Sequence, residues 1–309
     1  MIRQLLAALA LVLVSHAAPH PSLPGPTVPE GLGVNIHFTD PAEGEMDLLA
    51  SAGFRWVRMD FSWAGTERER GVYDFSAYDR LSAHLTKHGM KALFILDYGN
   101  KLYESDSSVR TEQGREAFAR WAAAAVKHFD GRGYLWEIWN EPNISFWKPE
   151  PNVDDYAALA NSAAKAIHDA VPSAAVIGPA TSGIDQRFIS GCFERGTLDG
   201  WAAVSVHPYR QTSPEGAGSE YRDLRQLIRK HAPAGREIPI LSGEWGYSAA
   251  WNGYNEDLQG VMLARQFLTN LSNGIPLSIW YDWKDDGTDP KEPEHHFGTV
   301  GHPETKDGK

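Results

Sequence analysis

Short apolar runs alternate with amphipathic segments along most of the chain. The apolar runs have the length of buried strands, and the segments between them carry apolar residues at helical spacing. This alternation predicts parallel strands joined by crossover helices. We expect strands at residues 32–38, 54–61, 91–97, 134–140, 175–178, 202–206, 239–243 and 276–283. We expect helices at residues 42–52, 76–88, 111–129, 154–170, 187–195, 220–231 and 256–272.

Eight such strands predict an α/β fold, a closed (β/α)8 TIM barrel. A single barrel is the economical fold for 309 residues with 42% hydrophobic content. Only seven helices are predicted, because residues 284–309 are rich in Asp, Gly, Pro, Glu and His and show almost no apolar periodicity. We therefore expect the eighth helix to be missing because the chain is truncated at its C-terminus. A longer form that carries this helix should unfold at a higher temperature.

The N-terminus has the layout of a secretory signal peptide. Arg3 is followed by an apolar run from Leu5 to Val14 and then by Ser-His-Ala, with cleavage expected after Ala17. We expect a signal peptide at residues 1–17, an extended and unpaired proline-rich leader at residues 18–30, and one barrel domain at residues 31–309. The protein should be secreted or periplasmic, and the single cysteine, Cys192, excludes an internal disulfide.

The charge balance limits the partners that the protein can bind. The chain has 29 Lys and Arg against 40 Asp and Glu, which gives a net charge of −11. Such an excess disfavours nucleic acid and anionic membrane surfaces, so we expect neither as a partner. An uncharged or cationic substrate fits better, and we expect a monomer.

Two glutamates follow apolar strands that are far apart in the sequence. Asn140 and Glu141 end the run Trp-Glu-Ile-Trp-Asn-Glu-Pro-Asn at residues 136–143, and Gly243 and Glu244 end the predicted seventh strand. A β/α unit takes roughly 30 residues, so Glu141 and Glu244 should lie three strands apart, across the barrel mouth. Cleavage of a glycosidic bond takes a proton donor and a nucleophile or base on either side of the bond. The spacing therefore predicts a glycosidase site.

These motifs resemble a known group of enzymes. Residues 137–143, residues 207–209 (His-Pro-Tyr) and residues 243–244 (Gly-Glu) are similar to clan A retaining glycoside hydrolases. Residues 33–38 (Gly-Val-Asn-Ile-His-Phe) and residues 136–143 most resemble glycoside hydrolase family 39, particularly its bacterial subgroup that acts on biofilm exopolysaccharide. The resemblance covers about residues 31–300, and families 5 and 51 share much of the pattern. It implies an oligosaccharide or polysaccharide substrate, with no cofactor and no metal.

The resemblance implies a role for four polar side chains. Glu141 would be the general acid/base and Glu244 the nucleophile, with their carboxyl groups about 5 to 5.5 Å apart. The charge on Glu244 should raise the pKa of Glu141. Asn140 would hydrogen-bond the sugar 2-hydroxyl, and Arg58 would keep the nucleophile ionised. Alternatively, Arg58 forms a structural ion pair with Glu137 inside the barrel.

Other candidate substrate-binding residues also lie at strand ends. We expect the Tyr209 hydroxyl to point at Glu244, with His207 on the same face, although ordinary rim packing is an alternative. His37, at the end of the first strand, is a candidate for binding sugar hydroxyls unless it is satisfied locally. Several tryptophans follow or end strands on the active face, and plain packing is the alternative to stacking on sugars. Of these we select as substrate-binding Trp147, Trp245, Trp280 and Trp283.

The predicted activity is internal cleavage of a polysaccharide. Long segments after the third and fourth strands, residues 98–110 and 144–153, suggest an elongated groove. Family 39 also contains exo-acting β-xylosidases and α-L-iduronidases, so exo action is an alternative. A transglycosylase and a non-catalytic carbohydrate-binding barrel are further alternatives. His295 and His296 are a weak metal-binding signal, since no other ligand is evident and a solvated loop explains them.

Overall fold

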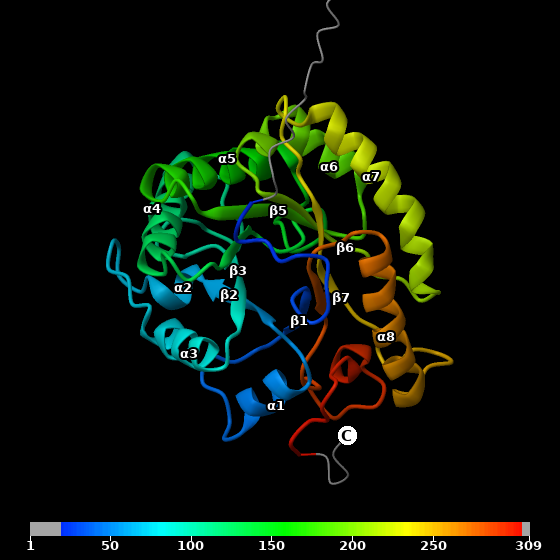
Figure 1. The fold of residues 1–309 in the computed structure, drawn as a ribbon. Helices are drawn as coiled ribbons and strands as arrows, with labels where there is room; N and C mark the ends of the chain where they lie inside the picture. Colours follow the sequence, from blue (N-terminus) through cyan, green and yellow to red (C-terminus); the bar gives the residue numbers. More distant parts are fainter. Residues whose placement is uncertain (1–19, 305–309) are drawn as a thin grey trace, which may run out of the picture.

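The strands form a closed, parallel barrel. The computed structural model describes residues 20–304. Each strand pairs with the next in sequence order, and β1 pairs with β8 to close the barrel (Figure 1). The strands are β1 (Leu32–Asn35), β2 (Trp56–Ser62), β3 (Lys91–Asp97), β4 (Leu135–Ile138), β5 (Ala175–Ser182), β6 (Ala203–His207), β7 (Ile240–Trp245) and β8 (Ser278–Trp280). The expected TIM barrel is confirmed.

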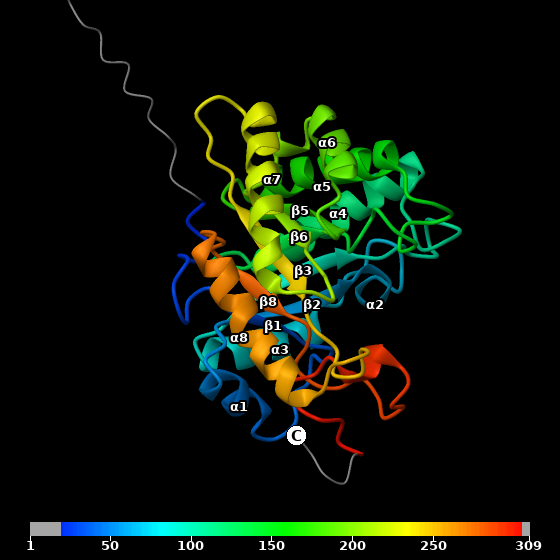
Figure 2. The same ribbon diagram turned by 90° about the vertical axis from the view of Figure 1, so that its right-hand side faces the viewer.

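The helices surround the barrel, as Figures 1 and 2 show from two directions. They are α1 (Glu45–Ser51), α2 (Trp63–Thr66), α3 (Ser76–Lys87), α4 (Glu112–His128), α5 (Val153–Ala170), α6 (Gln186–Glu194), α7 (Ala217–His231) and α8 (Glu256–Ser272). Three short 3₁₀ segments are η1 (Thr197–Asp199), η2 (Pro214–Gly216) and η3 (Pro293–His296). Side-chain caps begin the longest helices: Thr111 caps α4, Asn152 caps α5 and Asn255 caps α8. Across residues 20–304, none of the helices combines the length and apolarity needed to cross a membrane.

Alternating strand residues build two apolar cores and leave the mouth polar. On β3, Leu93 and Ile95 belong to the core inside the barrel, whereas Phe94 and Leu96 pack between the barrel and the helices. The same alternation on β2 places Trp56 in the inner core at one end of the strand. Further along, it turns polar side chains inward. The functional site is built on this polar layer.

The segment after β8 differs from a barrel helix, as expected. In the part of the chain that the structure describes, no α-helix follows β8, and η3 is the only helical turn there. Instead, the indole nitrogen of Trp283 donates to Glu45 on α1 at 3.1 Å. The carbonyl of His296 accepts from Gln259 on α8 at 2.9 Å. The segment thus lies beside both helices in Figure 1 and brings η3 close to the barrel mouth.

The leader corrects one expectation. Residues 20–30 are not unpaired, because Leu23 packs against the inner core of the barrel and Trp56 donates its indole N–H to the carbonyl of Glu30 at 3.0 Å. The leader folds back because burial of the Leu23 side chain against the inner core of the barrel is favourable. The predicted signal peptide at residues 1–17 lies outside the described residues.

Candidate active site

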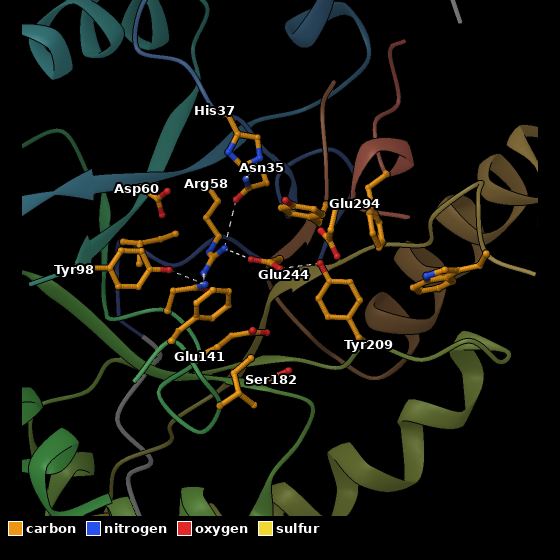
Figure 3. A pocket seen from close by; sticks show the side chains of 17 residues that line it. Asn35, His37, Arg58, Asp60, Tyr98, Glu141, Ser182, Tyr209, Glu244 and Glu294 are labelled. Atoms are coloured by element: carbon orange, nitrogen blue, oxygen red, sulfur yellow. Dashed lines mark hydrogen bonds and ion pairs between the residues drawn. The ribbon is translucent and has the colours of Figure 1, made fainter. Parts of the chain in front are cut away.

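The two glutamates meet at the C-terminal mouth of the barrel. Glu141 follows β4 and Glu244 lies near the end of β7, and both line one cavity of about 530 Å³ (Figure 3). One carboxylate oxygen of each residue lies within 4.8 Å of the other, and a nitrogen of His207 lies within the same distance of both. Two carboxyl groups this close can act on opposite ends of one bond.

The backbone after β4 leaves the strand conformation in order to aim its polar residues. Trp139 and Glu141 have left-handed backbones, with φ of 71° and 48°. Such conformations cost on the order of 1–3 kcal/mol for a residue other than glycine and gather at functional sites. They interrupt strand alternation, so the adjacent residues Asn140 and Glu141 both line the cavity. The backbone N–H of Glu141 is held by the carbonyl of Ala180 at 3.0 Å.

A β-bulge aims Glu244. The pairing of β7 with β8 shifts register between Ser242 and Trp245, so one extra residue turns Glu244 into the cavity. Gly243 allows this close approach, because a Cβ atom there would lie 2.2 Å from the Ser205 hydroxyl and 3.1 Å from a carboxylate oxygen of Glu137. The glycine is therefore required by packing and not by its backbone conformation.

Glu141 is almost completely buried, with 7% of its surface exposed. Burial raises the pKa of Glu141 to about 7, although the Arg58 guanidinium and the Ser182 hydroxyl lower it. The direction agrees with the prediction, but the main cause is desolvation instead of the charge on Glu244. A carboxyl with this pKa can both give and take a proton near neutral pH.

His207 orients Glu141. Its Nδ1 atom lies 3.0 Å from Oε1 of Glu141, and its Nε2 atom lies 3.3 Å from Nη2 of Arg58. A guanidinium can only donate, so Nε2 accepts and the ring proton sits on Nδ1, which donates to Glu141. Burial lowers the pKa of His207 to about 4, so the ring is neutral at pH 7. The sequence predicted His207 on the same face as Tyr209, and the structure places its Nδ1 atom 3.0 Å from Glu141 and 4.0 Å from Glu244.

Glu244 is held by two donors. The Tyr209 hydroxyl donates to Oε1 of Glu244 at 2.8 Å, as the sequence analysis expected, and Arg58 donates to Oε2. Burial and the neighbouring Glu244 carboxylate hold the pKa of Tyr209 well above its ordinary value, so this hydroxyl keeps its proton. These two hydrogen bonds, one from a hydroxyl and one from a guanidinium, fix the position of the Glu244 carboxylate.

Arg58 contacts both of its predicted partners, Glu137 and Glu244, at once. Its Nε atom donates to the fully buried Glu137 at 2.9 Å, while Nη1 donates to Glu244 and Nη2 donates to Asn140 at 2.7 Å. Burial opposes the charge of Arg58, but the Glu137 and Glu244 carboxylates outweigh this and raise its pKa. The structural ion pair therefore also fixes the guanidinium beside the candidate nucleophile.

His37 is exposed and lines the cavity, on the side opposite Glu141 in Figure 3. Its Nε2 atom lies 3.3 Å from Asp282 and 3.9 Å from Asp286. Burial opposes protonation of His37, but these two carboxylates raise its pKa, and burial raises the pKa of Asp282 to about 7. Two groups of residues have metal-ligand spacing. One is His37 with Asp282 and Asp286, and the other is Glu141 with His207 and Glu244, in which Glu244 already accepts a hydrogen bond from Arg58.

The four tryptophans selected as substrate-binding do not line the cavity, so direct stacking on sugar is wrong for them. Each is buried, with at most 4% exposed. Strand geometry explains this. The bulge in β7 places the Trp245 side chain in the core between the barrel and the helices, with Arg210 over its ring, and alternation on β8 places Trp280 in the same core. Trp147 packs on Trp139, and Trp283 bonds to α1.

Other residues complete the cavity, and the sequence analysis did not select them. They share positions on strand ends or on loops without periodicity. They are Asn35, Asp60, Ile95, Tyr98, Ile144, Phe146, Ser182, Trp251, Tyr281, Glu294 and Phe297. Asn35 and Asp60 lie two residues from His37 and Arg58, so strand alternation could have identified them.

A (β/α)8 barrel that brings two glutamates together at the C-terminal ends of β4 and β7 belongs to the class of clan A glycoside hydrolases. The sequence model of cellulase, described as glycosyl hydrolase family 5, matches residues 27–287. The chain therefore belongs to this family. The predicted clan and the predicted glycosidase class are confirmed.

Relatives and solved structures support the same class. A β-xylosidase of Geobacillus stearothermophilus is 34% identical over 169 residues, which are 46% of this chain and 33% of that protein. A phospho-cellobiase of Klebsiella oxytoca is 25% identical over 177 residues, which are 48% of this chain and 37% of that protein. The matches span about a third of the length of these curated relatives.

The fold is similar to that of family 39 enzymes. A family 39 glycoside hydrolase from Bacteroides cellulosilyticus WH2 superimposes with a TM-score of 0.78 at 24% identity, covering 89% of this chain and 60% of that one. A family 39 β-xylosidase from Caulobacter crescentus gives 0.70 at 21% identity, covering 90% and 69%. At these identities the likeness shows the fold.

Proposed function

We propose that the protein is a retaining glycoside hydrolase that cleaves O-glycosidic bonds of an oligosaccharide or polysaccharide by double displacement. The observation that carries this proposal is the approach of Glu141 and Glu244 to within 4.8 Å in one cavity. Retaining enzymes hold their carboxyl groups about 5–5.5 Å apart, whereas inverting enzymes need roughly 6.5–9.5 Å to admit a water molecule. The spacing favours direct attack on the sugar.

In the first half-reaction, protonated Glu141 donates to the glycosidic oxygen as the bond to the anomeric carbon breaks. The carboxylate of Glu244, held by Arg58 and Tyr209, attacks the anomeric carbon and forms a covalent glycosyl ester. Asn140 lines the same cavity and would hydrogen-bond the sugar 2-hydroxyl. The leaving sugar departs with the proton from Glu141.

In the second half-reaction, ionised Glu141 accepts a proton from water while the water oxygen attacks the anomeric carbon. The ester bond to Glu244 breaks, and its carboxylate returns to Arg58 and Tyr209. Two displacements restore the original configuration. The pKa of Glu141 of about 7 suits both steps.

Internal cleavage of a polysaccharide remains part of the proposal, and one observation favours exo action as a second candidate. The long segment after β3 contributes only Tyr98 to the cavity among the described residues. The rest of this segment does not line the cavity, and its Tyr103 ring stacks on Trp63 with the ring centroids 5.2 Å apart. The segment after β4 still contributes Ile144 and Phe146 to the cavity wall.

The test uses a panel of aryl glycosides and polysaccharides with the Glu141→Ala and Glu244→Ala variants. Both variants should lose activity, and azide should restore turnover to each. Glu150→Ala changes an exposed carboxylate outside the cavity and is the matched control. Proton NMR of the first-formed anomer should show retention, and inversion would contradict the assigned roles. Product sizing separates endo from exo action, and sugar transfer at high acceptor concentration would identify a transglycosylase.

We also propose that residues 1–17 direct export to the periplasm or beyond. Fractionation of cells that express the full chain should place the mature protein outside the cytoplasm. Retention of the uncleaved chain in the cytoplasm would contradict this.

A further inference from the structure

The cavity is lined by more carboxyl groups than basic side chains. Of the 17 residues that line it, one is an arginine and one a histidine. Four residues carry carboxylates: Asp60, Glu141, Glu244 and Glu294. Two of these are assigned above to the reaction. The others leave a surplus that the reaction does not explain.

Neither basic side chain offers a free positive charge to a ligand. Arg58 is 1% exposed, and its three nitrogens are engaged by Glu137, Glu244 and Asn140. The Nε2 atom of His37 faces two further carboxylates at 3.3 Å and 3.9 Å. A carboxylate or phosphate on the ligand would therefore enter the cavity without a counter-ion.

Glu294 is the carboxylate best placed to meet a ligand. It lies in η3, is exposed, and in Figure 3 lies near Glu244 and Tyr209, across the cavity from Tyr98. Its carboxylate has no hydrogen-bond or ion-pair partner among the residues that the structure describes. Desolvation at the mouth, and then the Glu244 carboxylate, raise the pKa of Glu294. An ionised carboxylate only accepts hydrogen bonds, so a ligand must supply the donors.

We propose that Glu294 is a specificity-determining residue that accepts hydrogen bonds from hydroxyl groups of the bound sugar and excludes sugars that carry a carboxylate or phosphate. The inference rests on the proposed function, because it assumes that a sugar occupies this cavity. Like charges a few ångströms apart in a partly desolvated site lower affinity by roughly tenfold. Neutral glycosides are therefore the substrate class, and the chain differs in this respect from α-L-iduronidases.

The test is a charge series on one sugar frame. Methyl β-D-glucoside, its 6-carboxylate (methyl β-D-glucuronide) and its 6-amino-6-deoxy analogue differ only in charge at C6. Dissociation constants from NMR titration of the full chain need no turnover, so they are independent of hydrolysis. We expect the glucuronide to bind at least about fivefold more weakly than the glucoside, and the amino sugar to bind at least as well. Raising the salt concentration to about 0.5 M should narrow these ratios.

Glu294→Gln removes the charge and keeps an oxygen acceptor, so it should improve glucuronide binding about 3- to 10-fold relative to the glucoside. Glu292→Gln is the matched control. Glu292 is exposed, does not line the cavity, and caps η3 through an oxygen that glutamine retains. This control should change the ratio by less than about twofold.

Several outcomes would overturn the inference. They are equal affinities for the three sugars, an equal shift in both variants, or no binding of even the neutral glucoside. Binding in the expected order by a chain that cleaves no glycoside would support the role of Glu294 and refute the proposed hydrolase. Hydrolysis of glycosides without charge discrimination would support the proposed hydrolase and refute the role of Glu294.

Discussion

The Nδ1 atom of His207 lies 3.0 Å from Oε1 of Glu141, and both side chains are buried. The Arg58 guanidinium occupies the other ring nitrogen, so the donated proton points at the candidate acid/base. A donor favours the ionised carboxylate and thus limits how far burial raises the pKa of Glu141. The contact with His207 therefore orients the Glu141 carboxyl, whose raised pKa comes from burial.

Replacing His207 with phenylalanine should therefore raise the pKa of Glu141. Because the pKa of Glu141 is about 7, kcat/KM should fall above about pH 7. In the variant this fall should begin roughly 0.5–1 pH unit higher, because the loss of a hydrogen bond to a charged group changes a pKa by about one unit. Activity should fall by about 10- to 100-fold as the carboxyl loses its orientation. Tyr209→Phe, which alters the contact to Glu244, should lower activity without moving the pH at which kcat/KM falls. An unchanged pH dependence of kcat/KM in the His207 variant would contradict the assigned hydrogen bond.

Glu141 should also make stability depend on pH. Its pKa is about 7 in the folded protein against an ordinary value of 4.5, so the folded state binds the proton more tightly. The contribution to stability is complete below pH 4.5 and is lost as the pH rises through 7. Glu141→Gln does not titrate, so relative to the wild type it should gain roughly 2–3 kcal/mol between pH 4 and pH 8. Denaturant unfolding at several pH values measures this, with Glu150→Gln as a flat control.

Leaving-group dependence tests the acid role of Glu141. In Glu141→Ala, an aryl glycoside whose leaving group needs no proton, such as 2,4-dinitrophenyl, should keep most of its glycosylation rate. A methyl or phenyl glycoside should lose about 10²- to 10⁴-fold, the usual contribution of general acid catalysis. Glu244→Ala should lose activity on all of them. Equal losses for good and poor leaving groups in Glu141→Ala would argue against proton donation.

The barrel could be predicted because its signal is repeated. Seven strand–helix units and a final strand each bury apolar side chains, so the period of the pattern gives both element type and order. The ends of the elements were less certain. β4 stops at Ile138, two residues early, because Trp139 has a left-handed backbone, and β5 continues to Ser182 past its own register shift. The exact ends of β4 and β5 depend on how each strand pairs with its neighbours, which the sequence pattern of one strand does not contain.

The site could be predicted where apolar strands carry or precede unusual polar residues, as with Arg58 within β2 and with Asn140 and Glu141 after β4. The burial of the four selected tryptophans could not be predicted. The bulge before Trp245 and the left-handed backbone at Trp139 reverse which side chains face the cavity. Only the packing around neighbouring strands reveals these reversals. Glu294 could not be found either, since its segment has no periodicity and reaches the mouth through contacts with α1, α8 and the loop after β7.

Gly243→Ala should destabilise the protein, although φ there is unremarkable for a non-glycine residue. The added Cβ atom would lie 2.2 Å from the Ser205 hydroxyl, so β7 or its neighbours must shift, at a cost of roughly 1–3 kcal/mol. Gly260→Ala is the matched control, because Gly260 lies in the second turn of α8 and nothing lies within 4 Å of a Cβ atom there. That change should stabilise by roughly 0.5–1 kcal/mol. Similar free energies of unfolding for the two variants would contradict the packing argument.

Two tryptophans should respond differently to truncation. Trp251 lines the cavity and is only partly buried, packed edge-on against Phe297 at 5.4 Å, so Trp251→Ala should mainly raise KM. Trp245 is fully buried, and Trp245→Ala should lower the free energy of unfolding by roughly 3–5 kcal/mol. Kinetics at a temperature where both variants are folded, with denaturant unfolding alongside, separate the two effects. If Trp245→Ala instead raised KM while unfolding like the wild type, its indole would have to reach the substrate, against the geometry of the bulge.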